Sequence, residues 1–235
     1  MKEKTEDSIA LITGGSQGIG YAIAHKLSAD NIKIVVADVK ELKDKKDNVW
    51  YKLCDVSDPV QVHNLYKWII SNVGTPDILI LNAGQGIHEK LTEGDPEKWQ
   101  KVINTNLMGA LRCIRSFVPD MLKKKKGHVF FISSVSANQP HPYGGVYSAS
   151  KSALEVIAET LRLETLPYIN VTVLSPGITE TNFFSNQISG NQTIEKIGMG
   201  AIQPEEIAED VMYILNKKQN TSINKIITRP ISQSF

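Results

Sequence analysis

The sequence predicts a doubly wound α/β fold, in which helices cover both faces of a parallel sheet. Short runs rich in Val and Ile alternate with longer amphipathic stretches along the whole chain. Runs of this kind, rich in Val and Ile and separated by helical stretches, are typical of parallel strands buried on both faces. No repeat, linker or low-complexity stretch divides the 235 residues, so we expect one domain over residues 1–235.

Seven runs are predicted to form strands, at residues 8–13, 32–38, 49–53, 77–82, 128–133, 170–174 and 225–228. Between them, helical spacing of apolar residues predicts helices at residues 18–29, 58–73, 97–125, 147–166 and 204–217. Pro59 and Pro204 stand in the first turns of two helices, directly behind Asp58 and Gln203, which favours a helix start. Residues 1–7 are expected to form a flexible N-terminus.

Composition and charge exclude several classes of protein. The net charge of +1 gives no electrostatic case for a nucleic-acid partner. No segment reaches 18 apolar residues, so no membrane span is expected. Cys54 and Cys113 form neither a Cys-x-x-Cys pair nor a Cys/His cluster, so we expect no metal and predict buried thiols in a reducing compartment. Because the N-terminus lacks an apolar leader segment, a cytoplasmic protein is expected.

A glycine-rich turn, Thr13-Gly-Gly-Ser-Gln-Gly-Ile-Gly20, follows the first predicted strand and leads into the first helix. Gly14 permits the tight turn, Gly18 lets the backbone approach a pyrophosphate, and Gly20 allows close packing of helix on strand. The helix N-terminus would add N–H donors and a partial positive charge. Such a turn can also be purely structural, so a cofactor site needs a second signal.

Asp38 supplies that second signal. It ends the second strand 18 residues after Gly20, where an acid hydrogen-bonds the ribose hydroxyls of adenosine. A carboxylate there repels a 2′-phosphate, and the next residue is Val39 rather than an arginine that would pair with one. NAD is therefore favoured over NADP, although Lys40, two residues on, leaves NADP possible.

Two further segments follow predicted strands. Asn82-Ala83-Gly84 comes after the fourth strand, at the edge where a doubly wound sheet binds its ligand. Asp55 and Val56 come after the third strand and could meet the adenine amino group. Asp55 could equally cap the helix that begins near Asp58.

Tyr147 and Lys151 are four residues apart in a predicted helix, so they share one face. A neighbouring ammonium favours the phenolate and lowers the pKa of a tyrosine from its usual ~10 toward a range useful for proton transfer. Taken alone, such a pair would more often arise by chance on a solvated helix face.

Together these motifs resemble those of the short-chain dehydrogenases/reductases, over roughly residues 8–182. Further motifs at matching positions are Asn106 in Asn-Thr-Asn-Leu-Met-Gly, Ser134 in Ile-Ser-Ser, and Pro176-Gly177 with Thr181. The resemblance implies a seven-stranded parallel sheet in the order 3-2-1-4-5-6-7. It also implies hydride transfer between a nicotinamide cofactor and an alcohol or carbonyl compound.

The resemblance assigns a role to each of four polar residues. Tyr147 would exchange the proton at the substrate oxygen, and Lys151 would lower the pKa of the tyrosine and hold the nicotinamide ribose. Ser134, thirteen residues before the tyrosine, would orient the substrate oxygen, and Asn106 would hold a water of a proton relay. The structural alternatives are a strand-end cap for Ser134 and a packing amide for Asn106.

The expected cofactor-binding residues are Gly14, Ser16, Gln17, Gly18, Ile19, Gly20, Asp38, Asp55, Val56, Asn82, Ala83, Gly84, Tyr147, Lys151, Pro176, Gly177, Ile178 and Thr181. By resemblance, the backbone of Ile178 and the hydroxyl of Thr181 would bind the carboxamide. Residues 182–201 are expected to form either a mobile flap over the substrate or a loop packed on its own domain. The expected substrate-pocket residues are Ser134, His141, Pro142, Tyr143, Tyr147, Phe183 and Phe184.

The chain ends Lys225-Ile-Ile-Thr-Arg-Pro-Ile-Ser-Gln-Ser-Phe235 and lacks the glycine-rich ending typical of acyl-thioester reductases. This ending resembles the branch of the family that oxidises 3-hydroxy acids or reduces small carbonyls. That branch usually prefers NADP, which conflicts with Asp38. We give Asp38 more weight because it would act directly on the ribose.

The leading hypothesis is an NAD(P)-dependent oxidoreductase that acts on a secondary alcohol or ketone, with Tyr147 as acid and base. The alternatives are a catalytically inactive dinucleotide-binding sensor or scaffold, and a 3-oxoacyl-thioester reductase. An extended sugar-nucleotide epimerase is set aside, because only about fifty residues follow Thr181. By resemblance, we expect a homodimer or homotetramer that packs through the helices at 97–125 and 147–166.

Overall fold

The computed structural model of the chain describes residues 8–40, 47–218 and 221–234, so the expected flexible segment 1–7 lies outside it. Its strands are β1 (Ile9–Thr13), β2 (Lys33–Asp38), β3 (Val49–Leu53), β4 (Ile78–Leu81), β5 (Gly127–Ile132), β6 (Ile169–Pro176) and β7 (Lys225–Thr228). They form one parallel sheet in the order β3-β2-β1-β4-β5-β6-β7. The predicted topology is confirmed, and β6 runs on beyond its predicted end to Pro176.

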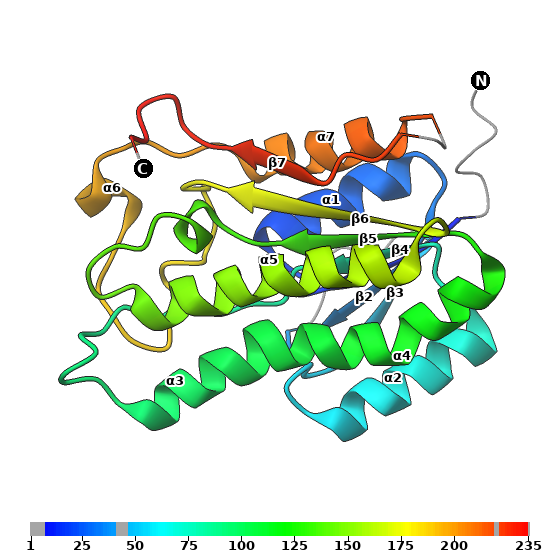
Figure 1. The fold of residues 1–235 in the computed structure, drawn as a ribbon, viewed down its shortest axis with the longest axis horizontal. Coiled ribbons are helices and arrows are strands. Elements are labelled where there is room, and N and C mark those ends of the chain that lie inside the picture. Colours follow the sequence, from blue (N-terminus) through cyan, green and yellow to red (C-terminus); the bar gives the residue numbers. More distant parts are fainter. Residues whose placement is uncertain (1–7, 41–46, 219–220, 235) are drawn as a thin grey trace.

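Helices cover both faces of the sheet (Figure 1). One face carries α1 (Gly18–Ala29) and α7 (Pro204–Leu215), and the other carries α2 (Pro59–Asn72), α4 (Gly109–Lys124) and α5 (Gly145–Thr165). Leu11 and Ile12, neighbours in β1, belong to two different apolar clusters and are both fully buried. Because side chains alternate along a strand, a strand covered on both faces must be apolar at every position.

The helix predicted at 97–125 is divided in the structure. It consists of α3 (Pro96–Ile103), a π-helical turn over Asn104–Met108, and α4. The spacing of apolar residues predicted one regular helix, which was wrong for the middle turn. At the start of α4, Gly109 packs on Val56, where a Cβ on the glycine would lie 2.6 Å from Val56 Cγ2.

Two other local differences concern short elements. The segment 182–201 contains a short helix, α6 (Ile194–Ile197), which the sequence did not predict. Asp58 is the residue that caps α2, because its carboxylate accepts the N–H groups of Val60 and Gln61 at 2.8 and 3.3 Å. The capping role considered for Asp55 therefore belongs to Asp58.

Both cysteines are free and buried. Burial raises the pKa of Cys54 to about 11 and that of Cys113 to about 12. Within the described residues, no group of three His, Cys, Asp or Glu side chains is placed to hold a metal ion. No helix in the same part of the chain has both the length and the apolar character that a bilayer crossing requires.

Candidate active site

The glycine-rich turn joins β1 to α1 at the C-terminal edge of the sheet. Gly14 and Gly18 have φ angles of +66° and +55°, a region that residues with a Cβ rarely adopt. A Cβ on Gly20 would lie 2.4 Å from the carbonyl oxygen of Gly14, so only glycine permits this approach of helix to turn. Within residues 8–40, 47–218 and 221–234, no side chain caps the N-terminus of α1. The first backbone N–H groups of this helix can therefore bind an anion.

The side chain of Asn82 lies beneath this turn. Its Nδ2 donates to the carbonyl oxygens of Thr13 and Gly14 at 2.9 and 2.8 Å. The Thr13 hydroxyl in turn accepts the backbone N–H groups of Asn82 and Ala83, both at 3.1 Å. The Asn-Ala-Gly segment after β4 thus holds the glycine-rich turn in place, so its amide acts on the protein rather than pointing toward a ligand.

Asp38 ends β2 beside the turn and is 8% exposed. Its two carboxylate oxygens accept the backbone N–H groups of Ser16 at 2.9 Å and Lys40 at 3.0 Å. The Lys40 ammonium donates to the side-chain oxygens of Gln17 and Asn186, at 3.4 and 3.2 Å. This side of the site therefore combines a carboxylate held by two backbone N–H groups with a nearby lysine.

Asp55 and Val56 lie on the same side of the site, after β3. The Asp55 carboxylate accepts the N–H of Ser57 at 2.8 Å, and the backbone N–H of Asp55 donates to Gln61 Oε1 at 2.9 Å. Both residues line the cavity that also reaches Asp38.

Tyr147 and Lys151 lie on α5, and Ser134 follows β5. The Lys151 ammonium is 5.8 Å from the centre of the Tyr147 ring and donates to the carbonyl oxygen of Ile132 at 2.8 Å. Burial raises the pKa of Tyr147 to about 12, against the opposing effect of a hydrogen bond with Ser134. The lowered pKa expected from the neighbouring Lys151 is therefore not found, because burial favours the protonated phenol. Burial also lowers the pKa of Lys151 to about 8. The three side chains meet at one point of the cavity wall.

Asn106 lies in the π-helical turn and is 1% exposed. Its Oδ1 accepts the N–H of Gln85 at 2.7 Å, and its Nδ2 donates to the carbonyl oxygen of Gln85 and to Ser150 Oγ, both at 3.0 Å. This amide fixes the loop after β4 to α5. A π-helical turn often marks a functional position, because it displaces one residue from the regular helix.

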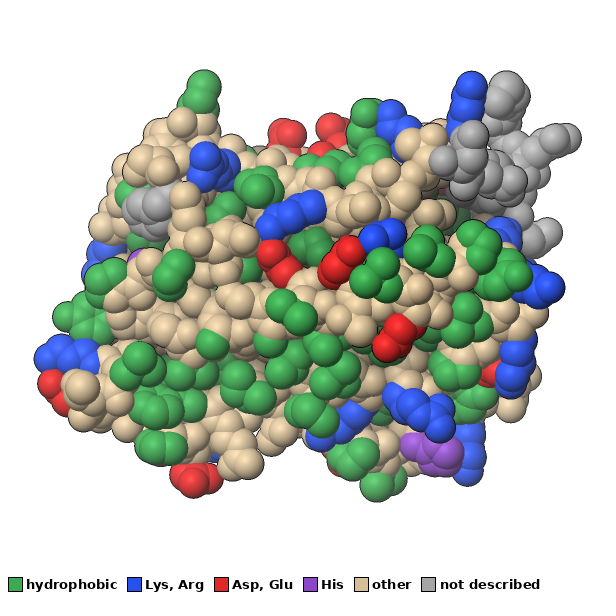
Figure 2. Space-filling model, viewed as in Figure 1, with side chains coloured by type: hydrophobic (Ala, Val, Ile, Leu, Met, Phe, Trp, Pro, Cys, Tyr) green, Lys and Arg blue, Asp and Glu red, His purple; other side chains and the backbone are tan. Residues whose placement is uncertain are grey.

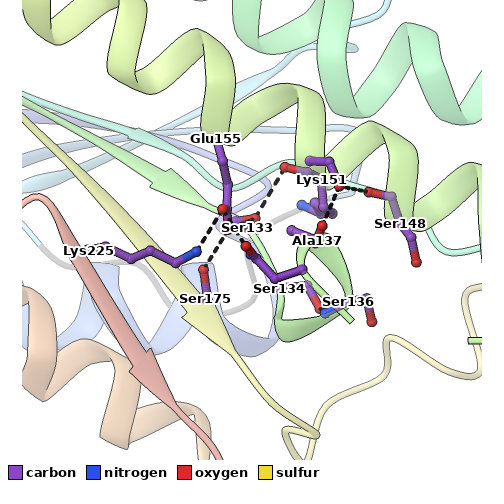
Figure 3. Close-up of polar contacts among 11 residues, drawn as sticks. Ser133, Ser134, Ser136, Ala137, Ser148, Lys151, Glu155, Ser175 and Lys225 are labelled. Carbon is purple, nitrogen blue, oxygen red and sulfur yellow. Dashed lines mark hydrogen bonds and ion pairs between the residues drawn. The ribbon is translucent and has the colours of Figure 1, made fainter. Parts of the chain in front are cut away.

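Glu155 lies one turn beyond Lys151 and was not singled out from the sequence. Its Oε1 accepts the hydroxyls of Ser133 and Ser175 at 3.1 and 3.0 Å (Figure 3). Its Oε2 accepts from Asn138 at 2.9 Å and from the Lys225 ammonium at 2.7 Å. Burial opposes the charged form, but these partners prevail and lower the pKa of Glu155. This carboxylate ties α5 to β6, β7 and the loop that carries Ser134.

A single cavity of about 1180 Å³ connects these groups. At one end it is lined by the glycine-rich turn, Asp38 and Asp55, and at the other by Ser134, Tyr147 and Lys151. All the expected substrate-pocket residues, Ser134, His141, Pro142, Tyr143, Tyr147, Phe183 and Phe184, also line it. Of the sequence-predicted site residues, all but Ser16, Gly20 and Asn106 line this cavity.

The segment 182–201 packs against the mouth of this cavity. The Phe183 ring lies 5.4 Å from that of Tyr147 and 5.7 Å from that of Phe184. The N–H of Ile188 donates to Gly86, and the N–H of His88 donates to Ser189. His88 was not predicted, yet its ring lies 6.0 Å from that of His141 and 5.2 Å from that of Tyr143.

The loop after β6 holds the last group of predicted residues. Thr181 faces the glycine-rich turn, since a Cβ on Gly18 would lie 3.1 Å from Thr181 Cγ2. The N–H of Ile178, expected to bind a carboxamide, donates to Gln233 Oε1 at 3.0 Å. Gln233 is 5% exposed, lines the cavity, and was missed because it lies 55 positions away in the sequence.

Comparison with known proteins agrees with this arrangement. Residues 8–192 match the family model described as short chain dehydrogenase. A relative from Staphylococcus saprophyticus, named as an uncharacterized oxidoreductase, is 33% identical over 98% of both chains. Another of the same description, from Staphylococcus aureus strain MRSA252, is 32% identical over 96% of this chain and 98% of the relative.

Two solved structures are similar over nearly the whole chain. One is an alcohol dehydrogenase from the archaeon Thermococcus sibiricus, complexed with 5-hydroxy-NADP. It has a TM-score of 0.83 and 27% sequence identity, and the match covers 96% of this chain and 97% of the dehydrogenase chain. The closed form of a serine dehydrogenase complexed with NADP+ has a TM-score of 0.88 at 25% identity, over 97% and 96% of the two chains.

Proposed function

Because the chain belongs to the short-chain dehydrogenase family and is an NAD(P)-dependent oxidoreductase of that family, we propose that it transfers hydride between a secondary alcohol and the corresponding ketone. The observation that carries this proposal is that Tyr147, Ser134 and Lys151 line the same cavity as the glycine-rich turn.

We also propose that residues 1–235 form one domain.

The residues of the cavity fit a dinucleotide. Gly14 and Gly18 present backbone without a Cβ at positive φ, and Gly18 is itself the first residue of α1, whose N-terminus has no side-chain cap. This surface suits a pyrophosphate, while Asp38 and Asp55 line the part of the cavity suited to adenosine. When bound, the nicotinamide ring supplies the site that accepts or releases hydride.

The protein's own residues would manage the proton and the orientation of the substrate. Hydride transfer to a carbonyl carbon places negative charge on its oxygen, which needs a donor and a second hydrogen bond. Tyr147 would give its phenolic proton to that oxygen, and the Ser134 hydroxyl would hold it in place. The Lys151 ammonium would stabilise the phenolate that remains. Oxidation follows the same steps in reverse.

Small hydroxy acids and small carbonyl compounds are the substrate class we propose. The similarity to a serine dehydrogenase supports a 3-hydroxy acid, and the chain ending at 225–235 resembles the same branch. The aromatic rings of Phe183, Tyr143 and His141 line the cavity that holds Tyr147, and the Phe183 ring lies 5.4 Å from that of Tyr147, which favours a compact substrate. Assays with NAD and NADP on a panel of alcohols, hydroxy acids and 3-oxoacyl thioesters test this assignment. Dinucleotide binding without any turnover would favour the sensor, and turnover of thioesters alone would favour the thioester reductase.

For the cofactor we propose NAD, on the basis of the Asp38 carboxylate. Both solved structures described above bind NADP or a derivative, but Asp38 is held by two backbone N–H groups where a 2′-phosphate would lie. Like charges placed together cost several kcal/mol. Asp38→Asn keeps an oxygen acceptor and removes the charge. We expect this variant to raise the affinity for NADPH relative to NADH by about tenfold, measured by fluorescence titration.

The matched control for Asp38→Asn is Asp30→Asn, in the turn after α1 and away from the cavity. This control should leave the NADH/NADPH ratio unchanged. A wild-type protein that already binds NADPH more tightly than NADH would overturn the assignment of NAD. In that case the Lys40 ammonium would be the group to substitute next.

We also propose a homodimer or homotetramer that forms through α4 and α5. Figure 2 shows hydrophobic side chains gathered over these helices, and Val156 and Leu163 of α5 are 66% and 57% exposed. The double variant Val156→Lys, Leu163→Lys should convert the oligomer to a monomer in light scattering. Leu53→Lys, on β3 and 71% exposed, is the control that should leave the mass unchanged. A monomeric wild type at micromolar concentration would contradict the proposal.

A further inference from the structure

The chain after β7 folds back over the C-terminal edge of the sheet, close to α6 (Figure 1). Ser232 Oγ donates to the carbonyl oxygen of Met199 at 2.5 Å, which fixes this tail to the segment after α6. The N–H of Gln233 donates to the carbonyl oxygen of Pro230 at 3.0 Å, and Pro230 is buried. These contacts turn the Gln233 side chain inward, where it is 5% exposed and lines the cavity.

The side-chain amide of Gln233 contacts the backbone of Gly177 and Ile178, in the loop after β6. Its Oε1 accepts the N–H of Ile178 at 3.0 Å. A Cβ on Gly177 would lie 2.2 Å from the same oxygen, so only glycine leaves room for this amide. The Ile178 N–H has a single proton, and that proton is engaged by Gln233. A cofactor carboxamide must therefore find another donor, or displace the glutamine.

The contact with Ile178 also fixes which way the Gln233 amide points. A backbone N–H is a donor, so the oxygen end of the amide must face it. The NH2 end then points away from Ile178. No acceptor within residues 8–40, 47–218 and 221–234 is bonded to this NH2 group. A polar group without a protein partner, on a buried side chain that lines a cavity, is placed to bind a ligand.

We propose that Gln233 is a nicotinamide-binding residue, whose NH2 group donates to the carboxamide oxygen of the cofactor. The amide relays the donor function of Ile178: it accepts from the backbone at one end and donates to the cofactor at the other. This inference rests on the proposed function, because it takes the ligand of the cavity to be a nicotinamide dinucleotide. It adds a residue of the C-terminal tail to the binding site.

Displacement of Gln233 by the cofactor is the competing arrangement. It would expose a buried side chain, break the hydrogen bond to Ile178, and move a tail that is anchored at Met199. The relay keeps all of these contacts and satisfies the free NH2 group. The two arrangements predict opposite effects when the side chain is removed, because removing a partner weakens binding and removing a competitor strengthens it.

The test compares NADH with ADP-ribose, which has the same adenosine, ribose and pyrophosphate but no nicotinamide. Dissociation constants are measured by calorimetric titration for the wild type, Gln233→Ala and Gln233→Glu. Gln233→Glu keeps an oxygen for Ile178 and so preserves the tail, but it has no NH2 to donate. Ser234→Ala, an exposed position in the same tail, is the matched control.

We expect both Gln233 variants to weaken NADH binding by about 3- to 10-fold, the effect of one neutral hydrogen bond. ADP-ribose affinity should stay at the wild-type value, and Ser234→Ala should change neither. Tighter NADH binding by Gln233→Ala would show displacement and overturn the proposal. Unchanged NADH binding, or equal weakening for both ligands, would overturn it as well. A wild type that binds neither ligand would instead refute the proposed function.

Discussion

The Tyr147→Phe variant is expected to lose turnover by at least about 100-fold, the low end of the contribution of a general acid. The substitution removes one hydroxyl and leaves the ring that packs 5.4 Å from Phe183. The fold and the cavity should therefore remain. NADH affinity should stay within about tenfold of the wild-type value, since one neutral hydrogen bond is the most that is lost. Steady-state kinetics on the best substrate of the panel, together with NADH titration, separate these two effects.

Tyr213→Phe is the control for this substitution. Tyr213 lies on α7 and is 55% exposed, so the loss of its hydroxyl should change neither turnover nor binding. Near-normal turnover in Tyr147→Phe would refute the proton-transfer role of the tyrosine, whatever the substrate. Loss of NADH binding in that variant would place Tyr147 in cofactor recognition instead.

The Gly20→Ala variant should lose NADH affinity by at least about 100-fold, because the glycine-rich turn cannot keep its shape. The added Cβ would lie 2.4 Å from the carbonyl oxygen of Gly14 and 2.5 Å from Asn82 Nδ2. Neither atom can move freely, since Asn82 Nδ2 donates to that same carbonyl at 2.8 Å. Overpacking of this kind costs about 1–3 kcal/mol of stability. NADH titration and urea denaturation measure the two consequences.

Gly145→Ala provides the comparison for this variant. A Cβ on Gly145 would meet only the side-chain carbons of Leu91, the nearest at 3.3 Å, and these can shift. Its stability and NADH affinity should remain close to those of the wild type. If Gly20→Ala bound NADH as tightly as Gly145→Ala, the turn would not be the pyrophosphate site.

Local signals in the sequence were sufficient for the sheet and for the first part of the site. The turn Thr13–Gly20 could be recognised because Gly14 and Gly18 supply the positive φ angles that it needs. Asp58 and Pro59 together indicate a helix start whatever the rest of the fold. Strands β1, β4 and β5 are buried on both faces at most positions and are rich in apolar residues, which made them recognisable. The edge strands β3 and β7 are partly exposed, but their short Val- and Ile-containing runs were still sufficient to identify them. The π-helical turn at Asn104–Met108 had no such signal, because one extra residue in a turn hardly disturbs the apolar spacing.

Glu155 and Gln233 show why the rest of the site could not be predicted. Glu155 contacts Lys225, 70 positions away, and Gln233 contacts Ile178, 55 positions away. Neither residue belongs to a short motif, and a glutamate on a helix is usually solvated. Asn82 was correctly placed at the edge of the sheet, but only the structure shows that its amide supports the glycine-rich turn. Such roles depend on which strands and loops become neighbours in three dimensions.

The two buried thiols have a practical consequence for spectroscopy. Alkylating dyes and spin labels react with thiolates, and burial keeps Cys54 and Cys113 protonated, with pKa values of about 11 and 12. A cysteine introduced on the exposed side of the segment 182–201 would therefore be the reactive thiol under mild conditions. A second one on α7 would complete a pair of probes, and the distance between them could be followed as cofactor and substrate are added.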